Sequence, residues 1–219
     1  MDKRKNYYLT IDTETANSMD EPLVYDIGGC VHDNKGNIYE TFSFVIREVF
    51  DNEELIRSAY YYNKRFRYQV ALYRHKAIKV NFYEARKYIL DLCKKYNIKA
   101  IIAHNARFDY RALTTTQRYL TKSKYRYFMP YGVPIWDTLK MAQDTICKQK
   151  SYIRFCKDNG FCQKNGKPRA TAEILYKYIS GNYNFDEEHT ALADALIESE
   201  IFTQCMRQHK KMRKEVWSK

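Results

Sequence analysis

Apolar residues gather in three stretches of the first 46 residues, 7–13, 23–31 and 38–46, and their composition predicts three β-strands. In the third stretch Phe42, Phe44 and Ile46 occupy every second position, which places them on one face of a strand. Residues 33–37 (Asp-Asn-Lys-Gly-Asn) have the composition of a turn. We therefore expect the second and third strands to form a hairpin.

The pattern then changes to one typical of helices. Residues 82–96 carry apolar side chains every three or four positions, which predicts an amphipathic helix. Further helices are expected over 52–74 (with an internal break), from about 105, and over 138–147, 171–179 and 190–208. Two short apolar stretches, 100–103 and 133–136, predict buried strands. A hairpin followed by alternating strands and helices indicates an α/β fold with a mixed sheet covered by helices.

The length of 219 residues and the 45% of hydrophobic residues suit a single buried core. No repeat or linker divides the chain, so we expect one domain over residues 1–208 and a basic tail over 209–219. Residues 1–10 lack the apolar stretch of a signal peptide, and no run is long enough for a membrane span. The six cysteines form no Cys-x-x-Cys pair, which argues against a zinc knuckle or a disulfide framework. These features predict a cytoplasmic protein with reduced thiols and no membrane partner.

Charge and aromatic content favour a nucleic-acid ligand. Lys and Arg number 38 against 26 Asp and Glu, a formal net charge of +12, and each phosphate that a cation neutralises releases a condensed counterion. The 21 tyrosines and 11 phenylalanines suit a single strand, whose bases stack on aromatic rings. Residues 63–79 interleave cations with rings and follow Tyr60, Tyr61 and Tyr62, as a strand-guiding patch would. A solvated cationic surface with ordinary core rings explains the same composition, and both interpretations stay open.

Two acids end the first predicted strand. Asp12 and Glu14 are two positions apart, and side chains two apart on a strand share a face. Carboxylates ~4 Å apart repel by about 4 kcal/mol at a surface-like dielectric constant, so a cation between them would be stabilising. Taken alone, however, this segment is better explained by two solvated acids at a strand end.

A second segment, 103–109 (Ala-His-Asn-Ala-Arg-Phe-Asp), joins a buried strand to a helix. Such a junction delivers polar side chains to the carboxyl edge of a sheet. Asp109 falls in the first turn of the helix, where it either serves a site or complements the helix dipole, and the residue alone does not separate the two. Asp137, which follows the last predicted strand, is better interpreted as the N-cap of the next helix than as a catalytic acid.

A third segment contains His189 and Asp194. On one continuous helix these two side chains would point about 140° apart and could not face one site. We therefore expect Thr190 to cap a helix, with His189 on the loop before it and Asp194 inside it. An isolated histidine at this position would more often be a plain surface residue.

Together the segments supply four carboxylates and one side chain that titrates near neutral pH. Oxygen-only ligation favours Mg²⁺ or Mn²⁺ over zinc. Two such ions ~3.5–4 Å apart can hold the attacking and leaving oxygens of a phosphodiester during in-line displacement. The set therefore predicts a two-metal phosphodiester site built from Asp12, Glu14, Asp109, His189 and Asp194.

The order Asp-x-Glu, His-Asn-x-x-Phe-Asp and His-x-x-x-x-Asp resembles the DEDD exonuclease family that carries an active-site histidine (DEDDh). This family includes polymerase-proofreading subunits, ribonuclease T and oligoribonuclease, and the resemblance spans about residues 6–206. The proofreading and phage enzymes are closest in build. The resemblance implies a ribonuclease-H-like fold with a five-stranded mixed sheet. It also implies that nucleoside 5′-monophosphates are removed from a single strand in the 3′→5′ direction.

The resemblance also assigns roles to the matching residues. Asp12, Glu14 and Asp194 would hold one divalent ion, Asp12 and Asp109 a second, and His189 would be the general base for the attacking water. The terminal nucleotide would be seated by Thr13, Thr15, His104 and Asn105.

These roles lead to expectations for the substrate and partners. The substrate is expected to be single-stranded DNA, the cofactors two Mg²⁺ or Mn²⁺ ions, and a DNA polymerase is a candidate partner. RNA is the nearest alternative substrate, because the sequence does not show contacts to a ribose 2′-hydroxyl. A non-catalytic nucleic-acid-binding or polymerase-accessory module is a weaker alternative, because all five active-site positions are filled.

Overall fold

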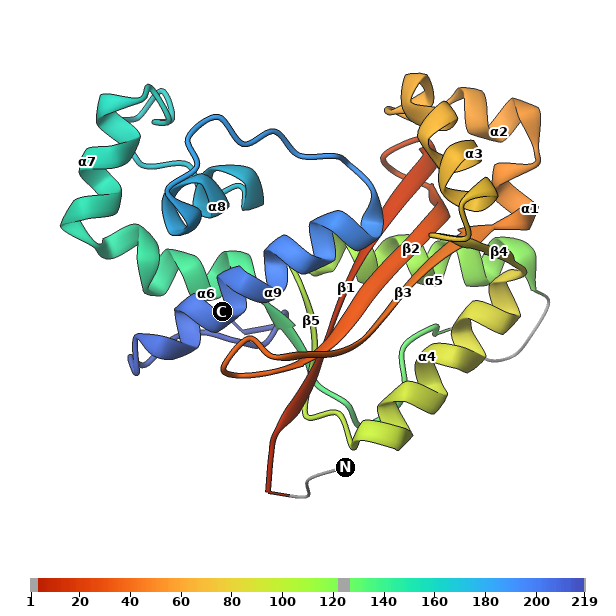
Figure 1. Ribbon diagram of the computed structural model, residues 1–219, viewed down its shortest axis with the longest axis horizontal. Coiled ribbons are helices and arrows are strands. Elements are labelled where there is room, and N and C mark those ends of the chain that lie inside the picture. Colours follow the sequence, from red (N-terminus) through yellow and green to blue (C-terminus); the bar gives the residue numbers. More distant parts are fainter. Residues whose placement is uncertain (1–3, 122–126, 219) are drawn as a thin grey trace.

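A six-stranded mixed sheet forms the centre of the protein (Figure 1). The computed structural model describes residues 4–121 and 127–218. In spatial order the strands are β4 (Ile78–Val80), β3 (Ile38–Ile46), β2 (Pro22–Asp33), β1 (Tyr7–Asn17), β5 (Ile101–Ala103) and β6 (Ile135–Asp137). β2 pairs antiparallel with both β1 and β3, whereas the remaining neighbours pair in parallel. The mixed α/β class and the hairpin between β2 and β3 are confirmed.

The sheet has one strand more than the five that were expected. The additional strand is β4, which pairs in parallel with the end of β3. Its three residues lie between two helices, and a segment this short cannot be distinguished from a loop by its apolar pattern. β1 also continues to Asn17, beyond its predicted end at Thr13. Asp12 and Glu14 consequently both lie inside a paired strand.

Helices cover the sheet. They are α1 (Arg47–Phe50), α2 (Glu53–Arg57), α3 (Arg65–Tyr73), α4 (Phe82–Tyr96), α5 (Arg107–Leu120), α6 (Thr138–Asp144), α7 (Lys150–Asp158), α8 (Ala172–Ser180) and α9 (Ala191–Arg207), with short 3-10 turns at Tyr62–Lys64 and Ile146–Lys148. The break expected within residues 52–74 separates α2 from α3. Within the described ranges, no helix combines the length and apolar character needed to cross a membrane.

Helix α7 was not predicted from the sequence, and the predicted helix over 138–147 ends early, at Asp144. The buried side of α7 consists of Tyr152, Phe155 and Cys156, which recur at helical spacing. Cations occupy much of its other side and dilute the apolar pattern. The helix is stabilised by packing its apolar side into a hydrophobic core that it shares with α6, α8 and α9.

Alternate side chains of β1 enter two different cores. Leu9 and Ile11 pack with α4 and α5 on one face of the sheet. Tyr8 packs on the other face, where its ring lies 4.7 Å from that of Phe202 in α9. Because side chains alternate between the two faces of a strand, Asp12 lies on the same face of the sheet as Tyr8. The acids of β1 therefore face α9, which crosses this side of the sheet in Figure 1.

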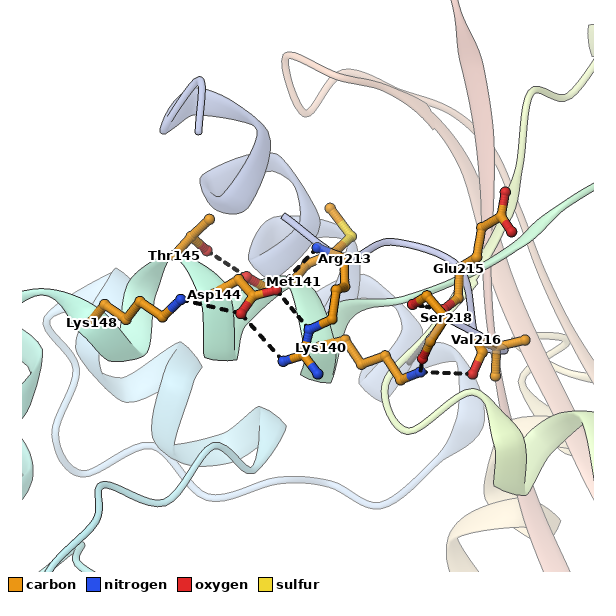
Figure 2. Close-up of polar contacts among 9 residues, drawn as sticks. All are labelled: Lys140, Met141, Asp144, Thr145, Lys148, Arg213, Glu215, Val216 and Ser218. Carbon is orange, nitrogen blue, oxygen red and sulfur yellow. Dashed lines mark hydrogen bonds and ion pairs between the residues drawn. The ribbon is translucent and has the colours of Figure 1, made fainter. Parts of the chain in front are cut away.

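Residues 213–218, from the segment expected to be a basic tail, run beside β6 (Figure 2). The Arg213 guanidinium forms an ion pair with Asp144 of α6, with Nε 2.9 Å from Oδ2. The backbone N–H of Asp137 donates to the Lys214 carbonyl at 2.7 Å, and that of Val216 donates to the Ile135 carbonyl at 2.9 Å. These contacts fix the segment against the sheet edge.

Candidate functional site

The two acids of β1 lie where α9 touches the sheet most closely. Asp12 is opposite Gly28 of β2, and Glu14 is opposite Asp26. A Cβ atom on Gly28 would lie only 2.0 Å from the backbone nitrogen of Leu192, so no larger residue fits beneath the first turn of α9. This close approach brings the beginning of α9 beside Asp12 and Glu14.

The third predicted segment has the expected arrangement at its helix start, with one correction. His189 lies on the loop, with a left-handed φ of 52°, and α9 begins at Ala191, directly after Thr190 at the N-cap position. The Thr190 side chain, however, makes no capping hydrogen bond. The carboxylate of Asp26 instead accepts from the backbone N–H of Ala191 at 2.9 Å. A strand residue far away in sequence therefore caps the helix, which local sequence rules do not reveal.

Three of the predicted site residues converge closely. One side-chain ligand atom each from Glu14, His189 and Asp194 lies within 4.8 Å of the others. Asp109 reaches the same end of β1 from α5, where its Oδ1 accepts a hydrogen bond of 2.8 Å from the Thr13 hydroxyl. Strand β1, helix α9 and helix α5 thus each deliver acids to one place.

The acids repel one another strongly. Burial, followed by the negative charges of Glu198, Asp109, Asp194 and Glu14, raises the pKa of Asp12 well above its usual range. Burial is also the main cause that raises the pKa of Glu14 to about 9, of Asp194 to about 8 and of Asp109 to about 7. Carboxylates held this close without a cation favour the protonated form, so a bound cation would be stabilising here.

A fifth acid, Glu198, was missed from the sequence. It lies one helical turn after Asp194 and is only 3% exposed. Burial and the charges of Asp109 and Asp194 raise its pKa well above normal. Its spacing of one helical turn after Asp194, on the same side of the helix, was the available signal, but the known motif ends at Asp194.

Three buried carboxylate oxygens have no hydrogen-bond partner among the described residues: Asp26 Oδ1, Asp194 Oδ1 and Glu198 Oε2. The last two belong to the acids that repel one another at this site. Buried polar atoms are nearly always satisfied, so unpartnered oxygens indicate a missing ligand. Hard divalent cations such as Mg²⁺ and Mn²⁺ bind carboxylate oxygens. The donor set therefore fits the divalent ions predicted from the sequence.

His189 is held by an aromatic stack and a neighbouring acid. The Tyr61 ring lies parallel to it, with 4.2 Å between centroids and 15° between planes. His189 Nδ1 lies 3.7 Å from the carboxylate of Glu187, a further acid not singled out from the sequence. Burial, and then the positive charge of Lys64, lowers the pKa of His189 below 6.5. The ring is therefore neutral near pH 7 and able to accept a proton.

The residues expected to seat a nucleotide lie in different environments. Thr13 is buried against Asp109, while Thr15 is half-buried just beyond an irregularity in the β1–β2 register. Asn105 is exposed and has a left-handed φ of 61°. His104 lies behind it, with Nδ1 3.0 Å from the Thr138 hydroxyl and Nε2 2.8 Å from the Ala170 carbonyl. Both ring nitrogens of His104 thus have protein partners, which suits a role in ordering this turn.

Asp137 is the N-cap that the sequence predicted. Its Oδ1 accepts the backbone N–H of Leu139 at 3.0 Å, inside the first turn of α6. The same oxygen accepts the backbone N–H of Asn105 at 3.0 Å. Asp137 therefore supports the turn that carries Asn105.

Several cations of the segment 63–79 have structural partners. Lys64 and Arg67 both donate to the carbonyl oxygen of Glu188, just before His189. Arg65 pairs with Glu53, and Lys79 with Asp51. These contacts tie the segment to the site loop and to its own neighbours, and the strand-guiding role suggested for it stays a prediction.

Comparison with known proteins supports the fold. The chain matches no protein-family model and no curated protein sequence. It is similar to solved structures of E. coli exonuclease I, among them a complex with a dA16 oligonucleotide (TM-score 0.58, 17% identity, 93% of this chain and 41% of that chain). A complex with a 5cy-dT13 oligonucleotide gives a TM-score of 0.57 at 18% identity over 94% of this chain and 41% of that one. The ribonuclease-H-like fold is confirmed, and the chain spans about two-fifths of the length of these exonuclease chains.

Without divalent ions, the protein is expected to lose stability as the pH rises from about 5 to 9. The unfolded chain titrates its carboxyl groups near pH 4, whereas folding raises the pKa of Asp109 to about 7, of Asp194 to about 8 and of Glu14 to about 9. The folded state therefore binds more protons, and the stability from these groups is lost as pH rises through their folded pKa values. Melting temperatures measured with a chelator should fall over this range, and added Mn²⁺ should restore them. A melting temperature independent of pH would contradict the repulsion.

Proposed function

We propose that this protein is a divalent-metal-dependent 3′→5′ exonuclease that acts on single-stranded nucleic acid, with DNA as the favoured substrate. The observation that carries the proposal is the convergence of Glu14, His189 and Asp194 within 4.8 Å, at the end of the strand that also holds Asp12. The fold shared with exonuclease I, whose structures include complexes with single-stranded oligonucleotides, supports the same class of reaction.

The acids of the site would hold the two ions. Asp12, Glu14 and Asp194 would bind one ion, and Asp12 and Asp109 the other. When bound, the ions would neutralise the phosphodiester and stabilise charge on the attacking and leaving oxygens. Thr13 would keep the Asp109 carboxylate oriented toward the site through its hydrogen bond of 2.8 Å.

His189 would take the proton from the attacking water. Its lowered pKa keeps the ring neutral at physiological pH, and its stack with Tyr61 fixes the plane of the ring. The oxygen of water would form a bond to phosphorus as the bond to the 3′-oxygen of the preceding nucleotide breaks. The 3′-oxygen then gains a proton, which leaves a shortened strand and a nucleoside 5′-monophosphate. Asn105, exposed beside the site, is the better placed of the motif residues to contact the terminal nucleotide.

One assay tests this function. Single-stranded DNA and RNA of matched sequence, labelled at either the 5′ or the 3′ end, would be incubated with Mg²⁺, Mn²⁺ or chelator. The 5′-labelled DNA should shorten in single-nucleotide steps, the 3′ label should appear at once as a mononucleotide, and chelator should stop both. Faster shortening of RNA would assign the alternative substrate. Internal fragments, or no cleavage with either ion, would contradict the proposal.

A further inference from the structure

A concave surface with a volume of about 550 Å³ follows the exposed side of α5, and we call it the α5 groove. It extends from Asn105 along the helix to Arg118, and its cations are Arg107, Arg111 and Arg118. Among the described residues that line it there is no aspartate or glutamate. The groove therefore presents a cationic surface that complements a polyanion.

Aromatic rings form one side of the α5 groove. Trp217 is 57% exposed and Tyr127 is 56% exposed, and Tyr110 lies between them. The Arg107 guanidinium lies 5.3 Å from the centre of the Trp217 ring, and Tyr110 meets that ring edge-on at 5.4 Å. Exposed rings interleaved with arginines are what a single strand requires, because bases stack on rings while cations follow the phosphates.

The tail contacts hold Trp217 in place. Lys140 Nζ donates to the carbonyl oxygens of Val216 at 2.8 Å and Ser218 at 2.5 Å, on either side of the tryptophan (Figure 2). The Val216 side chain is 1% exposed and packs with Ala103 and Ala106, at the turn that leads into α5. The backbone on both sides of Trp217 is fixed. Stacking of a base on the ring therefore requires little further ordering of the tryptophan, and the entropy cost of binding is small.

The α5 groove begins at the site described above. Asn105, expected to seat the terminal nucleotide, lines its first part, and Asp109 lies in the first turn of the same helix. At the far side, the rings of Tyr110, Tyr127 and Trp217 also line a second cavity of about 950 Å³, whose charged lining residues are Arg86, Lys94 and Glu215. A strand whose last nucleotide is at the acids can therefore continue over a charged and aromatic surface.

We propose that the α5 groove binds the part of a single strand that precedes its terminal nucleotide, with Trp217 as a stacking platform and Arg111 and Arg118 on the phosphates. The direction of the strand rests on the proposed function, whereas the binding itself does not. Arg111 donates a hydrogen bond of 2.9 Å to the Met19 carbonyl, and within the described part of the chain its other N–H groups have no hydrogen-bond acceptor, so they can donate to a phosphate.

The proposal is tested by binding of fluorescent oligothymidylates to the whole chain in the presence of chelator, which prevents hydrolysis. A trinucleotide and a dodecanucleotide would be compared for the wild type, Trp217→Ala, Trp217→Phe and Arg118→Ala. Arg154→Ala is the matched control, because Arg154 is an exposed arginine on α7 that does not line the groove. Melting temperatures would confirm that each variant folds.

Trp217→Ala should weaken binding of the dodecanucleotide roughly tenfold and leave the trinucleotide nearly unchanged, while Trp217→Phe should retain most of the affinity. Arg118→Ala should reduce the slope of log Kd against log salt by about 0.7, and Arg154→Ala should not. Dodecanucleotide binding that is unaffected by Trp217→Ala and Arg118→Ala would overturn the proposal. Equal losses of affinity for both oligomers would also overturn it, because they would indicate a structural role for the residue. Absence of binding by the wild type would overturn it too, and would indicate that the groove binds a protein partner instead.

The groove and the nuclease function can fail separately. If the wild type cleaves DNA and the variants bind it as tightly as the wild type, the proposed function is supported and the role of the α5 groove is contradicted. If binding depends on oligonucleotide length and on Trp217 but neither Mg²⁺ nor Mn²⁺ supports cleavage, the role of the α5 groove is supported and the nuclease function is contradicted.

Discussion

Asp194→Asn is expected to reduce the rate of cleavage by about a hundred- to a thousandfold or more. Removing one group that stabilises charge in a transition state usually lowers the rate by this amount. The same substitution should raise the melting temperature of the protein in chelator. Asp194 is buried, its pKa is raised to about 8, and one of its oxygens has no partner among the described residues. Removing its charge relieves repulsion within the cluster, so activity and metal-free stability should change in opposite directions.

Glu200→Gln is the matched control for this experiment. Glu200 is exposed on the same helix, and its substitution removes one negative charge outside the acid cluster. Cleavage should be nearly unchanged in this variant. If Asp194→Asn kept wild-type turnover, the metal assignment would be wrong. If it lost activity and stability together, the side chain would be structural.

His189→Ala is expected to lower turnover by about 10²- to 10⁴-fold, the usual contribution of a general base. Mn²⁺ affinity, measured by calorimetry in the absence of substrate, should change little. The wild-type rate should decline on the acid side only below the pH at which an ordinary histidine titrates, because burial and Lys64 lower the pKa of this ring. That decline reflects protonation of the base, so it should weaken in the variant.

Metal affinity separates the two roles that the position of His189 allows. Its ring nitrogen lies within 4.8 Å of ligand atoms of Glu14 and Asp194, a distance compatible with a metal ligand or with a base beside the metal. A large loss of Mn²⁺ affinity in His189→Ala would make the histidine a ligand. Unchanged turnover would remove it from the chemistry altogether.

Local patterns predicted much of the fold and the residues of the candidate site that converge in the structure, Glu14, His189 and Asp194. Apolar, β-prone composition marked β1, and alternating apolar residues marked β3. The spacing of Asp12 and Glu14 placed both on one strand face. Asp137 was identified as an N-cap from its position after a strand, and its hydrogen bond to Leu139 confirms this. These features depend on backbone geometry within a few residues, which is why the sequence reveals them.

Features that depend on distant partners were not predictable in this way. Asp26 caps α9 across the sheet, and Tyr61 stacks on His189 although more than a hundred residues separate them. Glu198 lies among the other acids only because α9 turns its buried side toward β1. No motif marks these residues, since each acts through contacts that exist only after the chain has folded.

The sequence by itself determined which side chains are available: four acids and a histidine, in an order and spacing that predict a two-metal phosphodiester site. Tertiary structure alone decided how those groups are arranged, because α9 is set against Gly28 of β2 and residues 213–218 fold back beside β6. The first packing adds Glu198 to the acid cluster, and the second places Trp217 at the α5 groove. The physical reason is that ligand identity is a property of individual side chains, whereas their convergence depends on packing between segments far apart in the chain.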